Sequence, residues 1–544
     1  MKNFAVLGHK LEMLSSYSCN KLPCFSQSFK AQIRSIFRVL LFHANPFYVQ
    51  LVYFVMLSLL GNLALMFTKP RTTRPKDVDV FFTSVSATTV SSMSVVEMEV
   101  FSNTHLIILT ILMLLGGEVF TSMLGLQFTK FKIIPKFHDH QTDSRVDVVD
   151  TKNHFPDSNA DQIELGLATH SHLENEKPQI IDHIDGVNNN NNNIKYNSIR
   201  FLGYVVLGYL LVVHIGGSIL VSLYFTLVPS AKHVLEKKGI EIQTFAVFTT
   251  VSTFSNCGFV PTNENMIVFK NNSGLLLLLL PQLLLGNTLY PACLRFLIWV
   301  LEKITKRVEF SYMLKNYKDM GYSHLLSSPR SFLLALTVLG FIVVQIIIFC
   351  AMEWKSEAMD GLTAYQKFVA SIFQTMNSRH AGESVIDLSV ISPAILVLFV
   401  VMMYLPPYTT FLPTTSDCED SASAKGIPNP RKTLVESLIF SQLSYLAIFI
   451  ILICITEREK MKEDPLNFSV LNVIIEVISA YGNVGFSTGY SCKRRLKHEG
   501  VCKDAWSGFS GRWSTQGKFI LITVMFFGRL KNFSTKHGKA WKLS

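Results

Sequence analysis

Four short segments rich in small residues could bring backbone oxygens to a cation. They read TTVSSMS, STFSNCG, MNSRHAG and SAYGNVG, and they end at Ser94, Gly258, Gly382 and Gly485. Peptide carbonyl oxygens that surround a pore can replace the hydration shell of an ion. Glycine suits the narrowest point because it reaches dihedral angles that other residues avoid and carries no side chain. One such glycine would be an ordinary turn or packing residue, but four similarly placed segments favour a shared site.

Each segment ends a short apolar run, and these runs read VDVFFTSVSATTV, IQTFAVFTTVSTF, YQKFVASIFQTM and FSVLNVIIEVISA. A run of this length is too short to cross a bilayer and is typical of a buried or re-entrant helix. Non-helical backbone at membrane depth is tolerated only where protein buries it or where it lines a water-filled cavity. The partly negative C-terminal end of such a helix favours a nearby cation.

Longer apolar runs flank the short ones and are long enough for bilayer-spanning helices. They lie near 46–68, 105–128, 201–228, 274–301, 332–353, 388–412, 434–455 and 516–529. The order long, short, long therefore occurs four times. The sequence predicts an all-α membrane protein of four helix–re-entrant pore loop–helix units around one central pore.

Composition supports a multi-pass membrane protein, since 49% of the 544 residues are hydrophobic and only 16% are charged. The net charge of +11 comes from basic residues between the apolar runs. That distribution favours loops facing cytoplasm or anionic lipid over a nucleic-acid partner.

The expected organisation follows from these runs. It comprises a cytoplasmic N-terminus (1–45), a first pore unit (46–129), a cytoplasmic disordered linker (130–199), a second pore unit (200–301), a cytoplasmic linker (302–330), a third pore unit (331–412), a cytoplasmic linker (413–432), and a fourth pore unit with a short cytoplasmic tail (433–544). An even number of spans places both termini on one side, and basic residues in the N-terminal segment favour the cytoplasm. The basic stretches Lys69–Lys76 and Cys492–Lys497 would then lie outside, so the rule supports this orientation only partly.

Five stretches resemble the plant HKT transporters, which are relatives of the microbial Trk and Ktr cation transporters. They are TVSSMSVVEMEVFSN, FSNCGFVPTNENM, NSRHAGE, SAYGNVGFSTGYSC and VMFFGRLKNFS. The resemblance covers nearly the whole chain and implies four membrane–pore–membrane units around one permeation path. It implies a selectivity filter that binds Na⁺ at Ser94, Gly258, Gly382 and Gly485, with Met93, Cys257, Ala381 and Val484 as backbone neighbours.

The Ser at the first filter position is similar to the sodium-selective subfamily. On this resemblance, replacing Ser94 by Gly is expected to increase potassium permeation. A basic residue on the last helix, here Arg529, looks like a barrier beneath the filter, although an interfacial Arg could instead snorkel to the headgroups. Microbial relatives imply a homodimer, and the plant relatives imply a plasma-membrane location.

Two further expectations concern loops. Asn271 opens an NNS glycosylation sequon in a predicted outer loop. Cys492 and Cys502 lie in one polar loop and could form a disulfide if that loop is outside the cell.

The function expected from these observations is sodium-selective cation transport driven by the electrochemical gradient, with sodium and possibly potassium as substrates and lipid as the surroundings. The alternative is a sodium–potassium symporter or another coupled secondary transporter. Coupled transporters often carry intramembrane carboxylates, and the predicted spans hold few. The sequence contains no HExxH, Walker A or kinase motif, so neither an enzyme nor a cofactor is expected.

Overall fold

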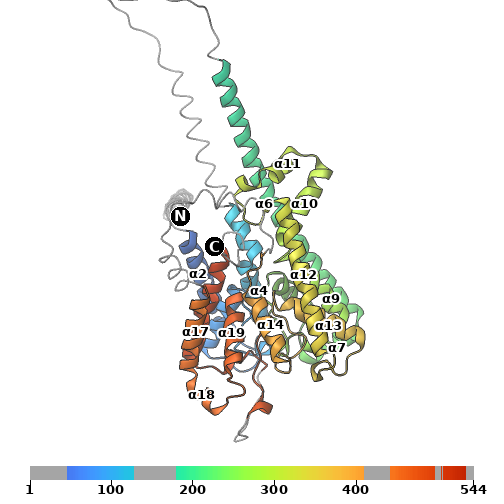
Figure 1. The fold of residues 1–544 in the computed structure, drawn as a ribbon, viewed down its shortest axis with the longest axis vertical. Helices are drawn as coiled ribbons and strands as arrows, with labels where there is room; N and C mark the ends of the chain where they lie inside the picture. Colours follow the sequence, from blue (N-terminus) through green and yellow to red (C-terminus); the bar gives the residue numbers. More distant parts are fainter. Residues whose placement is uncertain (1–45, 128–178, 410–441, 496–503, 505, 535–544) are drawn as a thin grey trace, which may run out of the picture. The chain divides into compact units, whose positions relative to one another are not determined.

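The computed structural model describes residues 46–127, 179–409, 442–495, 504 and 506–534 (Figure 1). The predicted N-terminal segment 1–45, the linker 413–432 and residues 130–178 of the first linker lie outside the described residues. The chain divides into a unit of residues 1–53 and a unit of residues 54–544. Apart from the start of the first helix, all the elements below belong to the second unit.

The described residues form helices and connecting segments, with no β-strand among them. The helices that flank the four short ones are α2 (Pro46–Phe67), α4 (Asn103–Gly116), α6 (Gln179–Leu227), α9 (Ser273–Leu285), α10 (Tyr290–Thr305), α12 (Ser328–Glu353), α14 (Pro393–Tyr404), α17 (Gln442–Thr456) and α20 (Thr515–Ser534). Smaller elements are α7 (Pro229–Lys238), α11 (Val308–Lys315), α18 (Arg458–Glu463), η1 (Met98–Val100), η2 (Asn265–Phe269), η3 (Tyr317–Met320), η4 (Glu357–Met359), η5 (Cys492–Arg494) and η6 (Phe509–Arg512).

Among the described residues, three helices are long and apolar enough to cross a membrane, or five if each bent pair counts as one span. The three are Phe47–Phe67, Asn193–Leu227 and Ser328–Glu353. The bent pairs are Asn103–Gly116 with Glu118–Gln127, at 55°, and Ser273–Leu285 with Tyr290–Thr305, at 81°. The sequence predicted two straight spans where these bends occur. The first break falls at Gly117, and the second falls at residues 286–289, which contain Gly286 and precede Pro291; glycine and proline weaken continuous helix.

One predicted boundary needs correction. Helix α6 begins at Gln179, so the last part of the predicted disordered linker 130–199 is helical. Extending an existing helix requires no new nucleation, and each added residue can gain a backbone hydrogen bond. A polar stretch that composition assigns to a linker can therefore continue a spanning helix.

The four short helices predicted from the sequence are present. They are α3 (Asp77–Thr88), α8 (Ile242–Phe254), α13 (Ala364–Asn377) and α19 (Val470–Gly482). Side-chain hydrogen bonds cap the N-termini of two of these helices. Thr363 and Gln366 form a capping box on α13, and the Ser469 hydroxyl accepts from the Asn472 N–H on α19. The last residues of each helix are buried, which places four helix C-termini inside the protein.

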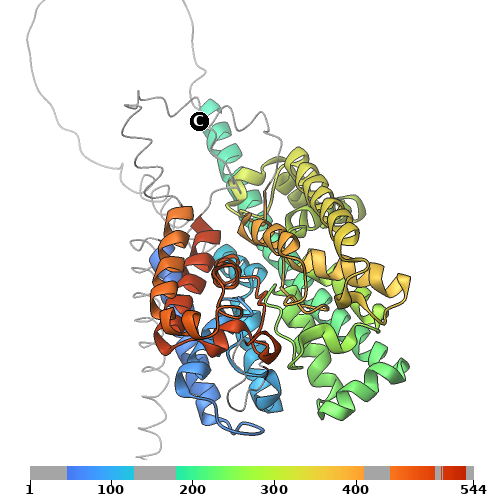
Figure 2. The ribbon, with the colours of Figure 1, turned by 60° about the horizontal axis from the view of Figure 1, so that its bottom comes forward.

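Helix packing brings the first and last parts of the second unit together. Helix α19 packs against α14, α17 and α20, and α20 in turn packs against α3 (Figure 2). Helix α8 packs against α4, α6 and α9, and α13 packs against α9 and α12. The short helices are therefore each enclosed by longer ones that come from more than one part of the sequence.

Three glycines allow longer helices to approach the ends of the short ones. A Cβ on Gly116, Gly286 or Gly528 would overlap the carbonyl oxygen of Thr88, Phe254 or Tyr481, respectively. In all three, the overlapped group is backbone at the end of a short helix, which cannot move aside as a flexible side chain can. Close packing at these points therefore fixes where the short helices end.

Replacing Gly528 by Ala is expected to destabilise the protein by about 1–3 kcal/mol, because an added carbon in a closely packed contact forces backbone to shift. The measurement is the thermal midpoint of the purified protein in detergent. Gly340→Ala in α12 is the matched control, since a Cβ there meets nothing within 4 Å. We expect that variant to be as stable as the wild type or slightly more so, because Ala is the better helix former. Equal midpoints for the two variants would contradict the packing role of Gly528.

Candidate ion pathway

All four predicted segments reach one cavity of about 300 Å³. Its lining includes Ser94, Gly258, Gly382 and Gly485, together with Ser92. Ser94, Gly258, Gly382 and Gly485 are each more than a hundred positions from the next along the chain. The fold thus brings the predicted site residues together, and we call this space the wide cavity.

The four segments also contact one another in turn around the cavity. A Cβ added to any of the three glycines would overlap a neighbouring segment: Gly258 with the Ala381 oxygen, Gly382 with the Val484 oxygen, and Gly485 with the Ser92 Cβ. The second segment therefore meets the third, the third meets the fourth, and the fourth meets the first. We call the four residues Ser92, Gly258, Gly382 and Gly485 the ring.

Backbone conformation agrees with Ser92 as the ring residue of the first segment. Its φ is +52°, and the φ values of Gly258, Gly382 and Gly485 are +86°, +70° and +97°. A non-glycine residue rarely adopts this left-handed conformation. The backbone N–H of Ser91, immediately before Ser92, donates to the carbonyl five residues earlier, at Ser86.

The same turn recurs before two of the glycines. The N–H of Cys257 donates to the Ser252 carbonyl at 2.9 Å, and the N–H of Val484 donates to the Ser479 carbonyl at 3.0 Å. Ser86, Ser252 and Ser479 are therefore equivalent, and so are the residues six positions after them: Ser92, Gly258 and Gly485.

The ring residue of the first segment is thus Ser92, two residues before Ser94, the residue predicted from the sequence for this position. Ser94 lies two positions beyond the ring and corresponds to Ser384 and Ser487. Its hydroxyl donates to the Val96 carbonyl at 2.6 Å, as that of Ser384 does to Ile386 at 2.8 Å. The backbone neighbour equivalent to Cys257, Ala381 and Val484 is Ser91, whereas Met93 follows the ring. The prediction from the sequence matched the segments at their last small residue. The structure instead sets the register from the serine whose carbonyl accepts the hydrogen bond of the turn, which is Ser86 in the first segment.

Acidic side chains line the wide cavity. Four carboxylates line it, one from the chain that follows each ring residue: Glu97, Glu264, Asp387 and Asp504. No Lys, Arg or His is among the described residues that line it. Clefts lined by charges of one sign raise the local concentration of the opposite ion, so this cavity should concentrate cations.

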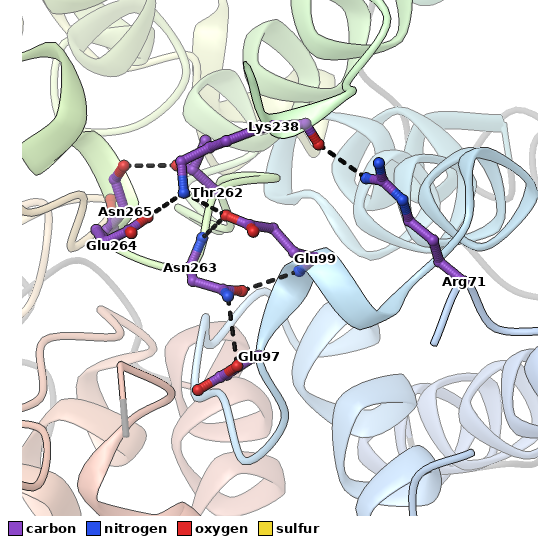
Figure 3. Close-up of polar contacts among 8 residues, drawn as sticks. All are labelled: Arg71, Glu97, Glu99, Lys238, Thr262, Asn263, Glu264 and Asn265. Atoms are coloured by element: carbon purple, nitrogen blue, oxygen red, sulfur yellow. Dashed lines mark hydrogen bonds and ion pairs between the residues drawn. The ribbon is translucent and has the colours of Figure 1, made fainter. Parts of the chain in front are cut away.

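A polar cluster joins the first and second of these post-ring segments (Figure 3). The Lys238 ammonium contacts carboxylate oxygens of Glu99 and Glu264, each at 2.5 Å. Asn263 donates its backbone N–H to Glu99 at 3.1 Å, and its side chain donates to Glu97 at 3.4 Å. Arg71 donates to the Lys238 carbonyl at 2.9 Å. One ammonium thus holds two acidic segments together at the edge of the cavity, and we call these contacts of Lys238 with Glu99 and Glu264 the clamp.

Removing this ammonium should be costly. We expect Lys238→Ala to lower the free energy of unfolding by about 1–3 kcal/mol, because hydrogen bonds to charged groups are lost and two carboxylates face each other. Lys237→Ala is the control, since Lys237 is exposed. Thermal midpoints of both variants measure the difference, and equal midpoints would contradict the clamp.

The pH dependence of the clamp has a definite sign. Burial disfavours the Lys238 charge, but hydrogen bonds and attraction from Glu264 and Glu99 outweigh burial, so the Lys238 pKa is raised. A raised folded-state pKa gives stabilisation that is complete below the unfolded value and is lost as pH rises through the folded value. The difference between wild type and Lys238→Ala should therefore stay constant between about pH 6 and 9.

A second, narrow cavity of about 30 Å³ is lined by residues that precede the ring, including Val90, Asn256 and Asn483. Arg529 also lines it, and its guanidinium donates to the Gly116 carbonyl at the break after α4. Glu118, in the same lining, accepts from the Tyr408 hydroxyl at 3.0 Å. The predicted barrier residue is therefore buried beside the ring and does not lie at a surface.

One further buried cation, Arg379, and the two predicted loop features are placed as follows. Arg379 is buried, donates to the Pro406 carbonyl at 2.7 Å and lies 4.8 Å from the centre of the Phe341 ring. Asn271 is exposed. Cys492 is half-buried and disulfide-bonded, and its predicted partner Cys502 lies outside the described residues.

Comparison with known proteins decides the family. The family model TrkH, described as "Cation transport protein", matches residues 187–410 and 429–536. The chain is 53% identical to "Sodium transporter HKT1" of Arabidopsis thaliana, over 88% of this chain and 92% of that one. It is 49% identical to "Cation transporter HKT1;3" of Oryza sativa subsp. japonica, over the full length of both. This chain is an HKT-type member of the TrkH family of cation transport proteins.

The HKT relatives include proteins with different printed activities. "Cation transporter HKT2;4" of Oryza sativa subsp. japonica is 38% identical over 94% of this chain and 98% of that one. A solved structure, the potassium transporter TrkH from Vibrio parahaemolyticus, matches with a TM-score of 0.47 and 15% identity, over 90% of this chain and 83% of that one. The HKT and TrkH proteins are transporters and not enzymes, and this member is a multi-pass membrane protein that transports cations.

Proposed function

We propose that this HKT-type protein is a sodium-selective pathway in which cations pass through the ring, driven by the electrochemical gradient. The observation that carries the proposal is the convergence of Ser92, Gly258, Gly382 and Gly485 on one acidic cavity. Sodium ions would bind backbone oxygens of these residues and their neighbours Ser91, Cys257, Ala381 and Val484. The printed activity of the Arabidopsis relative, sodium transport, supports the choice of ion.

Sodium preference would arise from the asymmetry of the ring. Ser92 carries a side chain where the other three positions carry none, and its Cβ occupies the contact with Gly485. A larger ion needs space and coordinating oxygens at all four positions. Whether cavity size or the strength of the coordinating dipoles discriminates is debated for channels generally, and Ser92 would alter both.

Arg529 would act as an electrostatic barrier on the other side of the ring. A buried guanidinium repels cations strongly because little water screens it. Its contact with the Gly116 carbonyl would hold it beside the pathway, and Glu118 in the same cavity would offset part of its charge.

The wider arrangement follows from this proposal. Pore units at 46–129, 200–301, 331–412 and 433–544 would surround the pathway in a plasma membrane, and both termini would be cytoplasmic. The wide cavity would then face outward, and exposed Asn271 would be available for glycosylation. A homodimer is the proposed assembly.

The alternative is coupled transport of sodium with potassium or protons. Voltage clamp of oocytes that express the protein separates the two. For a passive sodium pathway, the reversal potential follows the external sodium concentration and does not respond to external pH or potassium. A reversal potential that ignores sodium would overturn the proposal, and one that moves with potassium or pH at fixed sodium would favour coupling.

A further inference from the structure

One of the four positions that directly follow the ring differs chemically from the others. Met93, Phe259 and Phe486 are apolar there, and each is at most 2% exposed within an apolar cluster. The equivalent residue in the third segment is Glu383, and it is 0% exposed. The first, second and fourth segments are thus anchored by apolar packing, whereas the third is anchored by a carboxyl group.

The Glu383 carboxyl connects two segments. Its Oε1 accepts from the Thr253 hydroxyl at 2.6 Å. Thr253 is the penultimate residue of α8, the helix that leads to Gly258. The backbone N–H of Glu383 donates to the Asn377 side chain at 3.0 Å, which ties the backbone at Glu383 to the end of α13.

Packing alone does not explain this carboxyl. Its Oε2 is buried and has no hydrogen-bond partner among the described residues. Burying a polar atom without a partner is unfavourable, and an apolar side chain of similar size would avoid this cost, as at the other three positions. The Thr253–Glu383 hydrogen bond joins the same two segments that meet where Gly258 packs against the Ala381 carbonyl, so it can set how closely the second and third segments approach.

We propose that Glu383 is a positioning residue that holds the second and third ring segments together through Thr253 and so sets the discrimination between sodium and potassium. The inference rests on the proposed function, since it requires that cations pass through the ring. Glu383 acts through backbone position and does not touch the ion. Without the hydrogen bond between Thr253 and Glu383, the contact between the two segments becomes less rigid, and potassium, the larger ion, passes more readily.

The test compares permeability ratios in oocytes. Glu383→Met introduces the side chain found at position 93, and Thr253→Val removes the hydroxyl at nearly constant shape. Each is expected to raise the potassium-to-sodium permeability ratio by about threefold or more, the equivalent of one lost hydrogen bond. The double variant should change the ratio no more than the larger single change. Glu383→Gln, whose amide oxygen can still accept from Thr253, should stay near the wild-type ratio.

The controls separate selectivity from folding. Thr337→Val in α12 removes a hydroxyl that bonds only its own helix and should leave the ratio unchanged. If Glu383→Met fails to reach the surface, Thr253→Val carries the test. An unchanged ratio in Thr253→Val, multiplied effects in the double variant, or a Glu383→Gln variant as altered as Glu383→Met would overturn the inference. A wild type without sodium current would instead overturn the proposed function.

Discussion

Gly258→Ala is expected to reduce cation current at least about tenfold at equal surface expression, since forced off-rotamer and backbone shifts in close packing cost about 1–3 kcal/mol and local strain adds more. Two independent effects combine at this position. The φ of +86° is strained for any residue with a Cβ, and the new methyl group would overlap the carbonyl oxygen of Ala381. The overlap displaces an oxygen proposed to bind the ion.

A matched control distinguishes the two effects. Gly361 has a similar φ of +79°, but a Cβ there meets nothing within 4 Å. Gly361→Ala therefore reproduces the backbone strain without the clash at the ring. We expect it to conduct normally, whereas Gly258→Ala should not. Current normalised to surface protein is the measurement, and equal currents in the two variants would show that contact with Ala381 is unimportant for permeation.

The second large effect is expected for Ser92→Gly, which should raise the potassium-to-sodium permeability ratio about tenfold, or about 1.4 kcal/mol of discrimination. The substitution removes the Cβ at the contact with Gly485 and makes the four ring positions alike. It also relieves a positive φ of +52°, so the variant should fold at least as well as the wild type. Loss of selectivity would then not be a consequence of misfolding.

Ser94→Gly is the comparison that decides the register. Its hydroxyl bonds the Val96 carbonyl two residues on, and it lies beyond the ring. We expect its permeability ratio to stay close to that of the wild type. Reversal potentials in sodium and potassium solutions measure both variants. A large shift in Ser94→Gly with none in Ser92→Gly would restore the original alignment and contradict the structural register.

Much of the architecture could be predicted from apolar periodicity. The run from Ile242 to Phe254 coincides with helix α8, and the other three short helices begin and end within a few residues of their runs. The bends after α4 and α9 were not predicted, because hydropathy does not distinguish one long helix from two bent ones. The helical start of α6 was missed because a polar composition does not reveal a helix extended from its apolar part.

The candidate site was predictable where geometry demands one residue type. Glycines at 258, 382 and 485 adopt positive φ, and that requirement is visible in the sequence. Ser92 was missed because serine carries no such signal. Aligning SATTVSS with STFSNCG and SAYGNVG, from Ser86, Ser252 and Ser479, would have given the correct register. The contacts of Lys238 and Glu383 join segments far apart in the chain, and no local pattern predicts such pairs.

The central claim is that four segments line one permeation path. Cysteine substitution at the equivalent positions of the wide cavity tests it most directly: Ser94, Val260, Ser384 and Ser487. A positively charged thiol reagent applied to each variant should inhibit sodium current in all four and leave the wild type, with its own cysteines, unaffected. Inhibition at only one or two of the four positions, with normal surface expression and labelling of the others, would contradict a shared path.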